Sequence, residues 1–246
     1  MHYKITIEYD GTNYVGWQAQ IDCETPSIEK VLQDAIFAMT QEVVKLNCSG
    51  RTDSGVHAIA QVADFVASKE LEPFRMMMGL NNYLIDSDIV ITNCEIVDEN
   101  FHARFDAKLR SYRYIIVNRK SRLALQKNRA WHIHGDLNLE NMQKAAQHLL
   151  GSHDFSAFRD AKCQAKSPIK TVEKIDILRN EDQIIIEISA KSFLHHMVRN
   201  LVGTIVLAGL NKIEVDDVKE ILKSKDRTKS GQNAPACGLY FLGVKY

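Results

Sequence analysis

The stretch TPSIEKVLQDAIFAM (residues 25–39) decides the fold class of this 246-residue chain. Thr25 is a suitable N-cap, Pro26 suits the first helical position, and apolar residues recur at the spacing of one helix face. Those apolar residues are Ile28, Val31, Leu32, Ala35, Ile36 and Met39. An earlier run of alternating apolar residues predicts a half-buried strand. Its members are Tyr3, Ile5, Ile7 and Tyr9. A strand followed by a helix indicates a mixed α and β fold.

The rest of the chain continues this alternation of strands and helices. Strands are expected at residues 43–48, 59–67, 89–97, 110–117, 170–178, 183–190 and 238–246. Helices are expected at residues 73–84, 138–150, 193–209 and 215–223, with Gly151 closing the second and Gly209 ending the third. We therefore predict an α+β fold of two similar domains, 1–105 and 106–246, each a mainly antiparallel sheet with helices on one face.

Composition and cysteine usage are typical of an ordinary globular protein. Of the residues, 45% are hydrophobic and 25% are charged, which is enough to bury a sizeable core. The five cysteines form no CxxC pair, and an odd number is a poor disulfide framework, so a reducing compartment is favoured. The start of the chain has no signal-peptide pattern, and no apolar run is long enough to span a bilayer. We expect a cytoplasmic protein.

Charge is balanced overall but uneven along the chain. There are 31 basic and 31 acidic residues, which by itself opposes a chain coated in nucleic acid. Residues 104–129 are nevertheless strongly basic, with Asp106 as the only acid. A second basic stretch holds Lys162, Lys166, Lys170 and Lys174. These stretches are either solvated faces or a phosphate-contacting surface interleaved with Tyr112 and Tyr114.

The stretch GRTDSGVHA (50–58) places one carboxylate, Asp53, between glycines and two residues after Arg51. Asp-Ser-Gly is a common turn sequence in which the side chain bonds the local backbone. An arginine nearby can also hold a carboxylate ionised and aimed, as a nucleophile requires. An aspartic hydrolase is a third interpretation, but it needs apolar residues before the aspartate and a second carboxylate.

Other motifs of enzyme chemistry are missing or weak. The sequence has no GxGxxG, P-loop or GxSxG, so the dinucleotide, NTP and α/β-hydrolase signatures are absent. His195 and His196 are adjacent, so on a helix they should point to different sides and not share a metal. His57, His132 and His134 are expected to be satisfied surface or loop residues. No metal site is predicted.

Six blocks along the chain share a pattern. They are YDGTNYVGWQ (9–18), GRTDSGVHA (50–58), FHARFDA (101–107), RSYRYIIVN (110–118), FLHHMVRNLVG (193–203) and APACGLYF (234–241). In this order and over nearly the whole chain, they resemble the TruA-type pseudouridine synthases. The resemblance implies an isomerase of tRNA processing that converts uridine to pseudouridine in the anticodon arm, around positions 38 to 40. It also implies sheets joined across a central RNA-binding cleft, a homodimer, and no cofactor.

The resemblance also implies roles for individual residues. Asp53 becomes the catalytic nucleophile, although the sequence leaves open whether it attacks the ribose, attacks the base or removes a ribose proton. Arg199 is expected to pair with Asp53 across the two domains and keep it charged. Tyr112 is expected to stack on the flipped uracil, which offsets part of the cost of unstacking it. The remaining substrate-binding residues are Arg51, Arg110 and Leu239, with Leu239 closing the pocket and Phe155 and His195 in support.

One segment departs from the family pattern. Where the family has an Arg-Thr-Val-Gln-Gly-like start to the first helix, this chain has CETPSIE (23–29). The missing basic residue and glutamine leave two alternatives open. The protein could act on another RNA site, such as a different tRNA position or rRNA, or it could be a catalytically idle RNA-binding module.

Overall fold

The computed structural model describes residues 1–18, 24–161 and 163–246, so Cys23 and Lys162 lie outside the described residues. The chain forms two compact units. The first comprises Met1–Lys108 together with Tyr240–Tyr246, and the second comprises Leu109–Leu239. These units differ from the predicted domains at the C-terminus, because the final strand packs with the first unit.

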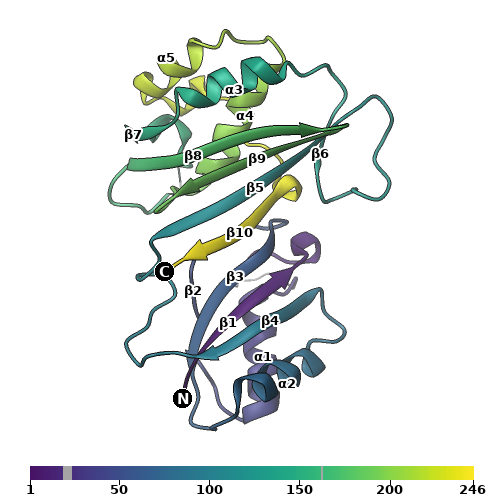
Figure 1. Ribbon diagram of the computed structural model, residues 1–246, viewed down its shortest axis with the longest axis vertical. Helices are drawn as coiled ribbons and strands as arrows, with labels where there is room; N and C mark the ends of the chain where they lie inside the picture. Colours follow the sequence, from purple (N-terminus) through teal and green to yellow (C-terminus); the bar gives the residue numbers. More distant parts are fainter. Residues whose placement is uncertain (19–23, 162) are drawn as a thin grey trace. The chain divides into compact units, whose positions relative to one another are not determined.

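The first unit is a sheet with two helices. Its elements are β1 (His2–Tyr9), α1 (Ile28–Thr40), β2 (Asn47–Cys48), β3 (His57–Val66), α2 (Pro73–Tyr83), β4 (Ile89–Ile96) and most of β10 (Leu239–Lys245). The strand order is β4-β1-β3-β10, with β2 also paired to β3. Only β10 runs parallel to its neighbour β3, and the described pairs of β1 with β3 and β4 are antiparallel. Figure 1 shows α1 and α2 together on one face of this sheet.

The opening strand and helix form as their patterns predict, with one correction at the helix start. Tyr3, Ile5 and Ile7 are completely buried, as expected for the inner face of a strand. The N-cap of α1 is Ser27, not Thr25, and its hydroxyl accepts a hydrogen bond from the Lys30 amide. The helix starts here because the next two amides, of Ile28 and Glu29, donate to the carbonyls of Gly16 and Trp17.

The strand predicted at residues 43–48 is wrong in length. Only Asn47 and Cys48 pair with β3, opposite Asp64 and Ala63. Val43 is 92% exposed, so apolar character there does not report burial. A β-strand needs a partner backbone, and the apolar run alone could not reveal where that pairing begins.

The second unit is a similar arrangement. Its elements are β5 (Leu109–Asn118), β6 (Trp131–Ile133), α3 (Leu139–Gln147), β7 (Gly151–Asp154), β8 (Ile169–Asn180), β9 (Gln183–Ala190), α4 (Met197–Gly209) and α5 (Asp217–Ser224). The strand order is β5-β9-β8-β7, all antiparallel, with β6 paired in parallel to β5. Helices α3, α4 and α5 pack against this sheet (Figure 1). Two mainly antiparallel units with packed helices confirm the predicted α+β class.

Two helix boundaries in this unit were predicted wrongly. Helix α3 ends at Gln147, and Gly151, at a φ of +93°, begins the short strand β7 instead of closing the helix. Helix α4 starts at Met197, not at residue 193, because His196 adopts a left-handed φ of 61°. Asp160 fixes this conformation, since its amide donates to the His195 carbonyl and its carboxylate contacts the His196 ring. The sequence pattern did not predict β6 or β7.

Candidate active site

The turn that carries Asp53 is held by main-chain contacts to the segment 9–18. The Trp17 amide donates to the Thr52 carbonyl at 3.0 Å, and Gly16 forms an isolated β-bridge with Asp53. The Val56 amide closes the turn by donating to the Asp53 carbonyl at 3.1 Å. The carbonyl oxygens of Thr52 and Asp53 are therefore satisfied by amide donors, as buried peptide groups require.

Two glycines of YDGTNYVGWQ make this contact possible. A Cβ on Gly16 would lie 2.5 Å from the Thr52 carbonyl oxygen, and the φ of +101° at Gly16 disfavours other residues. A Cβ on Gly11 would lie 2.0 Å from the Val56 carbonyl oxygen. The first motif thus serves as the backbone support for the second.

Side chains on both sides of Asp53 anchor the turn. The Thr52 hydroxyl lies 2.7 Å from the buried hydroxyl of Tyr9, whose pKa burial raises far above its ordinary value. The Ser54 hydroxyl donates to the Tyr14 carbonyl at 3.1 Å. Asp53 itself is half-buried. Its neighbours and its main chain hold the turn, which presents the carboxylate at a fixed place.

His57 ends the turn and was predicted wrongly as a surface or loop residue. It is 2% exposed on β3, and its ring stacks on Tyr240 with centroids 4.7 Å apart. Its Nδ1 accepts from the Gly11 amide at 3.0 Å and lies 3.1 Å from an Asp10 carboxylate oxygen. His57 therefore contributes to the contact between the turn and the segment 9–18.

Positive charge gathers near the same turn within the first unit. Burial raises the pKa of Cys48 to about 12, with Glu29 adding to the rise and the charges of Arg51 and Arg104 opposing it. Burial also raises the pKa of Glu29, and Arg51 opposes that rise. Arg51 is exposed, as is Arg104 from FHARFDA. The charges of both arginines therefore act on the Cys48 thiol against the effects of burial and of Glu29.

A second aspartate of this unit, Asp64 on β3, has a structural role. It is 1% exposed, and its carboxylate accepts from His2 Nε2 and from Asn47 Nδ2, each at 2.9 Å. Its other oxygen accepts from the Ala103 amide at 2.7 Å, within FHARFDA. His2 Nδ1 also lies 3.0 Å from the Asp98 carbonyl oxygen, so both ring nitrogens contact oxygen atoms of this unit. This network fixes the segment that carries Arg104.

In the second unit, Arg199 lies on α4 beside the segment that precedes β10. Its Nε donates to the Ala234 carbonyl at 2.7 Å, and the Ala234 amide donates to the Arg199 carbonyl at 3.2 Å. Arg199 is half-exposed, whereas its neighbour Asn200 is 1% exposed and donates to the Phe158 carbonyl. The arginine is therefore a fixed side chain, not a loose surface group.

The two tyrosines of β5 differ in environment. Tyr114 is fully buried, and its hydroxyl donates to the Pro235 carbonyl at 2.7 Å. Tyr112 is half-buried, and its ring meets Phe193 edge-to-face at 5.2 Å. The Phe193 ring thus contacts the Tyr112 ring at nearly a right angle, an arrangement common for aromatic pairs. Tyr114 is thus a core residue, and Tyr112 is the candidate for a base contact.

Leu239 is positioned by the glycine before it. A Cβ on Gly238 would lie 2.6 Å from the Tyr114 ring and 2.9 Å from the Ile115 carbonyl oxygen, so a larger residue cannot pack here. Leu239 follows at the end of the second unit and is 5% exposed. Glycine at position 238 therefore lets the backbone before Leu239 pack closely against β5.

His195 and His196 lie on the same side of the chain, contrary to prediction. Both precede α4, their rings are 3.9 Å apart, and the carboxylate of Asp160 lies 2.8 Å from His196 Nδ1 and 3.7 Å from His195 Nδ1. The prediction assumed a helix here, but the left-handed His196 breaks it. The cluster fixes the N-terminus of α4, two residues before Arg199.

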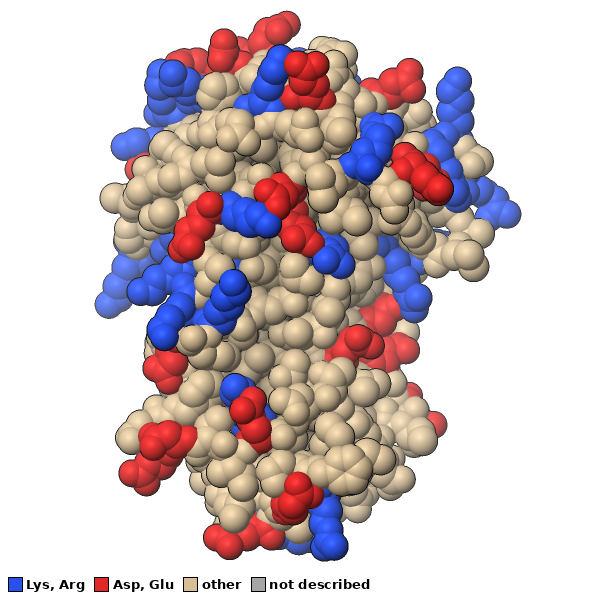
Figure 2. Space-filling view, in the orientation of Figure 1, with Lys and Arg blue, Asp and Glu red and all other residues tan. Residues whose placement is uncertain are grey.

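Charge divides between the units. The first unit holds nine Lys and Arg against seventeen Asp and Glu, a net charge of −8, and the second holds 22 against 14, a net charge of +8. Figure 2 shows Lys and Arg outnumbering acids in much of the second unit's visible surface. Arg110 does not belong to this exposed set, since it is 9% exposed and donates to the Lys191 carbonyl. Exposed cations follow it in the loop between β5 and β6, at Arg119, Lys120, Arg122, Lys127 and Arg129.

The predicted site residues come from both units. Asp53 and Arg51 belong to the first, and Tyr112, Arg199 and Leu239 belong to the second, as does Arg110. Sequence patterns missed the supporting residues Asp64, His2 and Asp160. A lone Asp or His in a strand or loop carries no local signal, because its partners are distant in the chain. Among the described residues, no helix is long and apolar enough to cross a membrane.

Comparison with known proteins agrees with this arrangement. The family described as tRNA pseudouridine synthase matches residues 5–106 and 145–246. The chain is 47% identical to tRNA pseudouridine synthase A of Ehrlichia chaffeensis and 46% identical to that of Ehrlichia ruminantium, over all 246 residues and the full length of each relative. The resemblance seen in the six motifs is confirmed, and the chain belongs to the tRNA pseudouridine synthase family.

Proposed function

We propose that this protein converts uridine to pseudouridine in the anticodon arm of tRNA, around positions 38 to 40. Its relatives of 46–47% identity are named for the tRNA reaction. The observation that carries the proposal is the Asp53 turn, whose backbone is fixed by the Trp17 and Val56 amides while the carboxylate stays half-buried. A structural aspartate in the same unit, Asp64, is 1% exposed and accepts from three donors.

The proposed reaction needs a carboxylate and no redox partner. The N1–C1′ bond of uridine breaks, the base rotates, and C5 bonds to C1′, while the C5 proton leaves and N1 gains one. Asp53 acts as the nucleophile, because a fixed carboxylate can stabilise the detached intermediate covalently. Arg199 keeps that carboxylate ionised, and Leu239 limits access of water to the base. These roles are the ones that the resemblance of the sequence blocks implies.

Tyr112 is proposed to hold the extruded uracil. Extrusion from a stacked helix costs a few kcal/mol, and stacking on an aromatic ring returns about 1–3 kcal/mol. The half-buried ring already packs against Phe193, so less side-chain freedom is lost when a base stacks on it. Tyr114 cannot take this role, because it is fully buried.

RNA affinity is proposed to come chiefly from the second unit. Its net charge of +8 and the cations of the β5–β6 loop fit a phosphate-contacting surface. Arg51 and Arg104 add a smaller cationic region beside the Asp53 turn. Arg110 is better placed to support β5 and β9 than to meet a phosphate, since its guanidinium bonds a backbone carbonyl.

The homodimer and the cytoplasmic location are also proposed, on the resemblance. The described cysteines Cys48, Cys94, Cys163 and Cys237 are free thiols, which favours a reducing compartment. Light scattering of the purified protein should give twice the chain mass. Fractionation of cells should recover the protein with other cytoplasmic enzymes.

The decisive experiment is pseudouridine mapping on unmodified tRNA transcripts incubated with the purified protein. Carbodiimide adducts should appear at positions 38 to 40 and nowhere else in the transcript. Adducts confined to another tRNA position would overturn the proposed position, and adducts formed only on an rRNA transcript tested in parallel would overturn tRNA as the substrate. Tight tRNA binding without any adduct would support an idle RNA-binding module and overturn the enzyme.

A further inference from the structure

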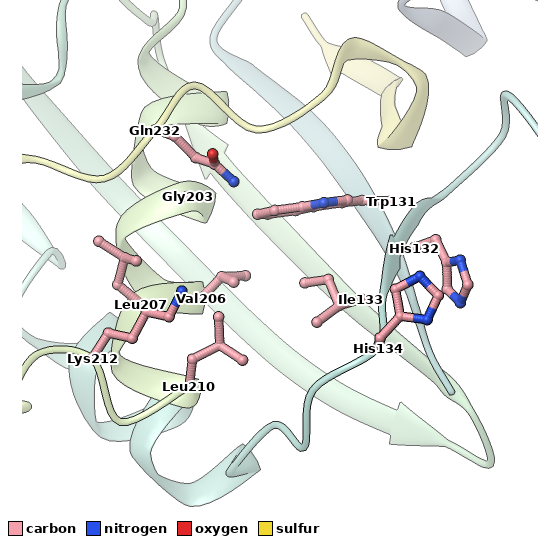
Figure 3. A pocket seen from close by; sticks show the side chains of 10 residues that line it. All are labelled: Trp131, His132, Ile133, His134, Gly203, Val206, Leu207, Leu210, Lys212 and Gln232. Atoms are coloured by element: carbon pink, nitrogen blue, oxygen red, sulfur yellow. The ribbon is translucent and has the colours of Figure 1, made fainter. Parts of the chain in front are cut away.

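A cavity of about 330 Å³ lies inside the second unit, between one face of α4 and strand β6 (Figure 3). It falls within the size range of small-ligand pockets, about 300–1,000 Å³. The apolar wall consists of Trp131 and Ile133 from β6, Gly203, Val206 and Leu207 from α4, and Leu210 directly after that helix. None of the residues assigned to catalysis lines it.

The walls of the cavity form a flat apolar slot. Trp131 and Ile133 are alternate residues of β6, and in Figure 3 both side chains point toward α4. The indole is half-exposed, and Tyr114 packs against it edge-to-face at 6.2 Å. Val206 from the helix and Leu210 directly after it face the indole (Figure 3). A slot with one aromatic wall and aliphatic walls opposite suits a planar heteroaromatic ring.

Gln232 brings an amide to the rim of the slot. A Cβ on Gly203 would lie 1.9 Å from the Gln232 carbonyl oxygen, so only glycine lets this segment cross α4 here. The neighbouring Gly231 amide donates to the Thr204 hydroxyl at 2.8 Å, which fastens the crossing. Figure 3 shows the Gln232 side chain beside the indole. An amide carries both donors and an acceptor, as the edge of a nucleobase does.

One cation lines this slot, and a basic loop is bonded to two of its lining residues. Lys212 is exposed and lines the cavity. The basic β5–β6 loop is tied to the cavity by two ring nitrogens: His132 Nε2 lies 2.9 Å from the Arg119 carbonyl, and His134 Nδ1 lies 3.2 Å from the Lys120 carbonyl. An apolar slot with a hydrogen-bonding rim and a lysine in its lining matches a flat base joined to a phosphate.

We propose that this cavity binds one unstacked nucleotide of the RNA substrate, other than the target uridine. The base lies against Trp131 with its edge at Gln232, and its phosphate faces Lys212. The identity of this RNA as the substrate tRNA rests on the proposed function. The same chemistry could be supplied by a free nucleotide, so the test must separate the two sources.

The test uses the indole of Trp131 as the reporter. The chain has two tryptophans, and Trp17 is 1% exposed, so a Trp131→Phe variant assigns both indole NMR signals. Adding UMP, CMP, AMP or GMP should shift the Trp131 signal saturably and leave the Trp17 signal in place. Inorganic phosphate should not reproduce the shift. No saturable shift with any of the four nucleotides, or an equal shift with phosphate alone, would overturn the proposal.

Two variants and one control localise the site. Gln232→Ala and Lys212→Glu should each weaken nucleotide binding about tenfold, the equivalent of one hydrogen bond or ion contact. Lys219→Glu, an exposed lysine of α5, should leave it unchanged. Equal affinity in all three variants would overturn the assignment.

Competition then identifies the source of the nucleotide. Substrate tRNA should displace UMP from the cavity, and a nucleotide that stays bound at saturating tRNA would overturn the RNA assignment. These readouts need no turnover. If the unmodified protein forms pseudouridine but binds no nucleotide, the result counts against the cavity alone. If it binds nucleotides but forms no pseudouridine, the result counts against the proposed function alone.

Discussion

The two units of this protein carry opposite charges of equal size, −8 for the first and +8 for the second. The acidic unit presents the candidate nucleophile Asp53, and the basic unit presents the exposed cations of the β5–β6 loop. A net charge of zero therefore hides a surface suited to RNA. The difference suggests that the chemistry and most of the phosphate attraction can be disrupted separately.

The largest effect should follow from removing the charge of Asp53. Asp53→Asn keeps the size of the side chain, and the turn keeps its main-chain bonds, so we expect unchanged folding and tRNA binding. Pseudouridine formation should fall at least about 10³-fold, because a nucleophile is lost. Tritium release from C5-labelled uridine in tRNA measures the rate.

Asp86→Asn, an exposed aspartate of the same unit, is the matched control and should be fully active. A normal rate in Asp53→Asn would remove the carboxylate from the mechanism. Lost tRNA binding in that variant would show that the acidic unit also carries affinity.

Asp64→Asn tests whether another acid of this unit is purely structural. The amide would turn one acceptor into a donor facing the donors His2, Asn47 or Ala103. The free energy of unfolding should fall by about 3 kcal/mol, as for a broken buried pair, while folded enzyme stays active. Urea titration measures the loss.

The control for stability is Asp34→Asn, whose exposed ion pair with Lys30 should be worth less than about 1 kcal/mol. Equal unfolding midpoints for the two variants would contradict the structural role of Asp64.

Charge reversal sharpens the contrast between the units. Replacing Lys120, Arg122 and Lys127 by Glu should weaken tRNA binding about 100-fold at low salt, because phosphate contacts are lost. The loss should shrink at high salt, with the salt slope falling by about one for each lost contact. Filter binding over a salt series measures both quantities.

The matched variant reverses Lys30, Lys69 and Arg75, three exposed cations of the first unit, and so changes the charge equally. It should alter tRNA binding much less. Equal losses in both triple variants would show that total charge, not its location, governs affinity.

The smallest effect concerns the base contact. Tyr112→Leu should lower the rate about tenfold, within the value of one stacked base. Tyr112→Phe keeps the ring and should stay near the normal rate, which separates stacking from the hydroxyl. Full activity in Tyr112→Leu would contradict the base contact, and the contact of Tyr112 with Phe193 would then be structural only.

The sequence predicted elements whose signal is local. Alternation located β1, β5 and β9 closely, since strand side chains alternate between faces. The helix pattern located α1, and GRTDSGVHA was correctly placed as a turn beside a sheet. The motif glycines Gly16 and Gly238 were visible in the sequence, but the carbonyls and ring that exclude a Cβ there were not.

Other features depended on partners distant in the chain. Ser27 caps α1 because the next amides meet carbonyls of residues 16 and 17. Asp160 contacts His196 directly before α4, so the helix starts at Met197 and not at residue 193. His2 and Asp64 form a hydrogen bond although they are 62 residues apart in the chain. The sequence by itself determined the class of fold, the family and the residues offered for chemistry. Tertiary structure alone decided that Asp64 is buried among donors and that Asp53 is half-buried, because burial and hydrogen bonding arise only when distant segments pack together.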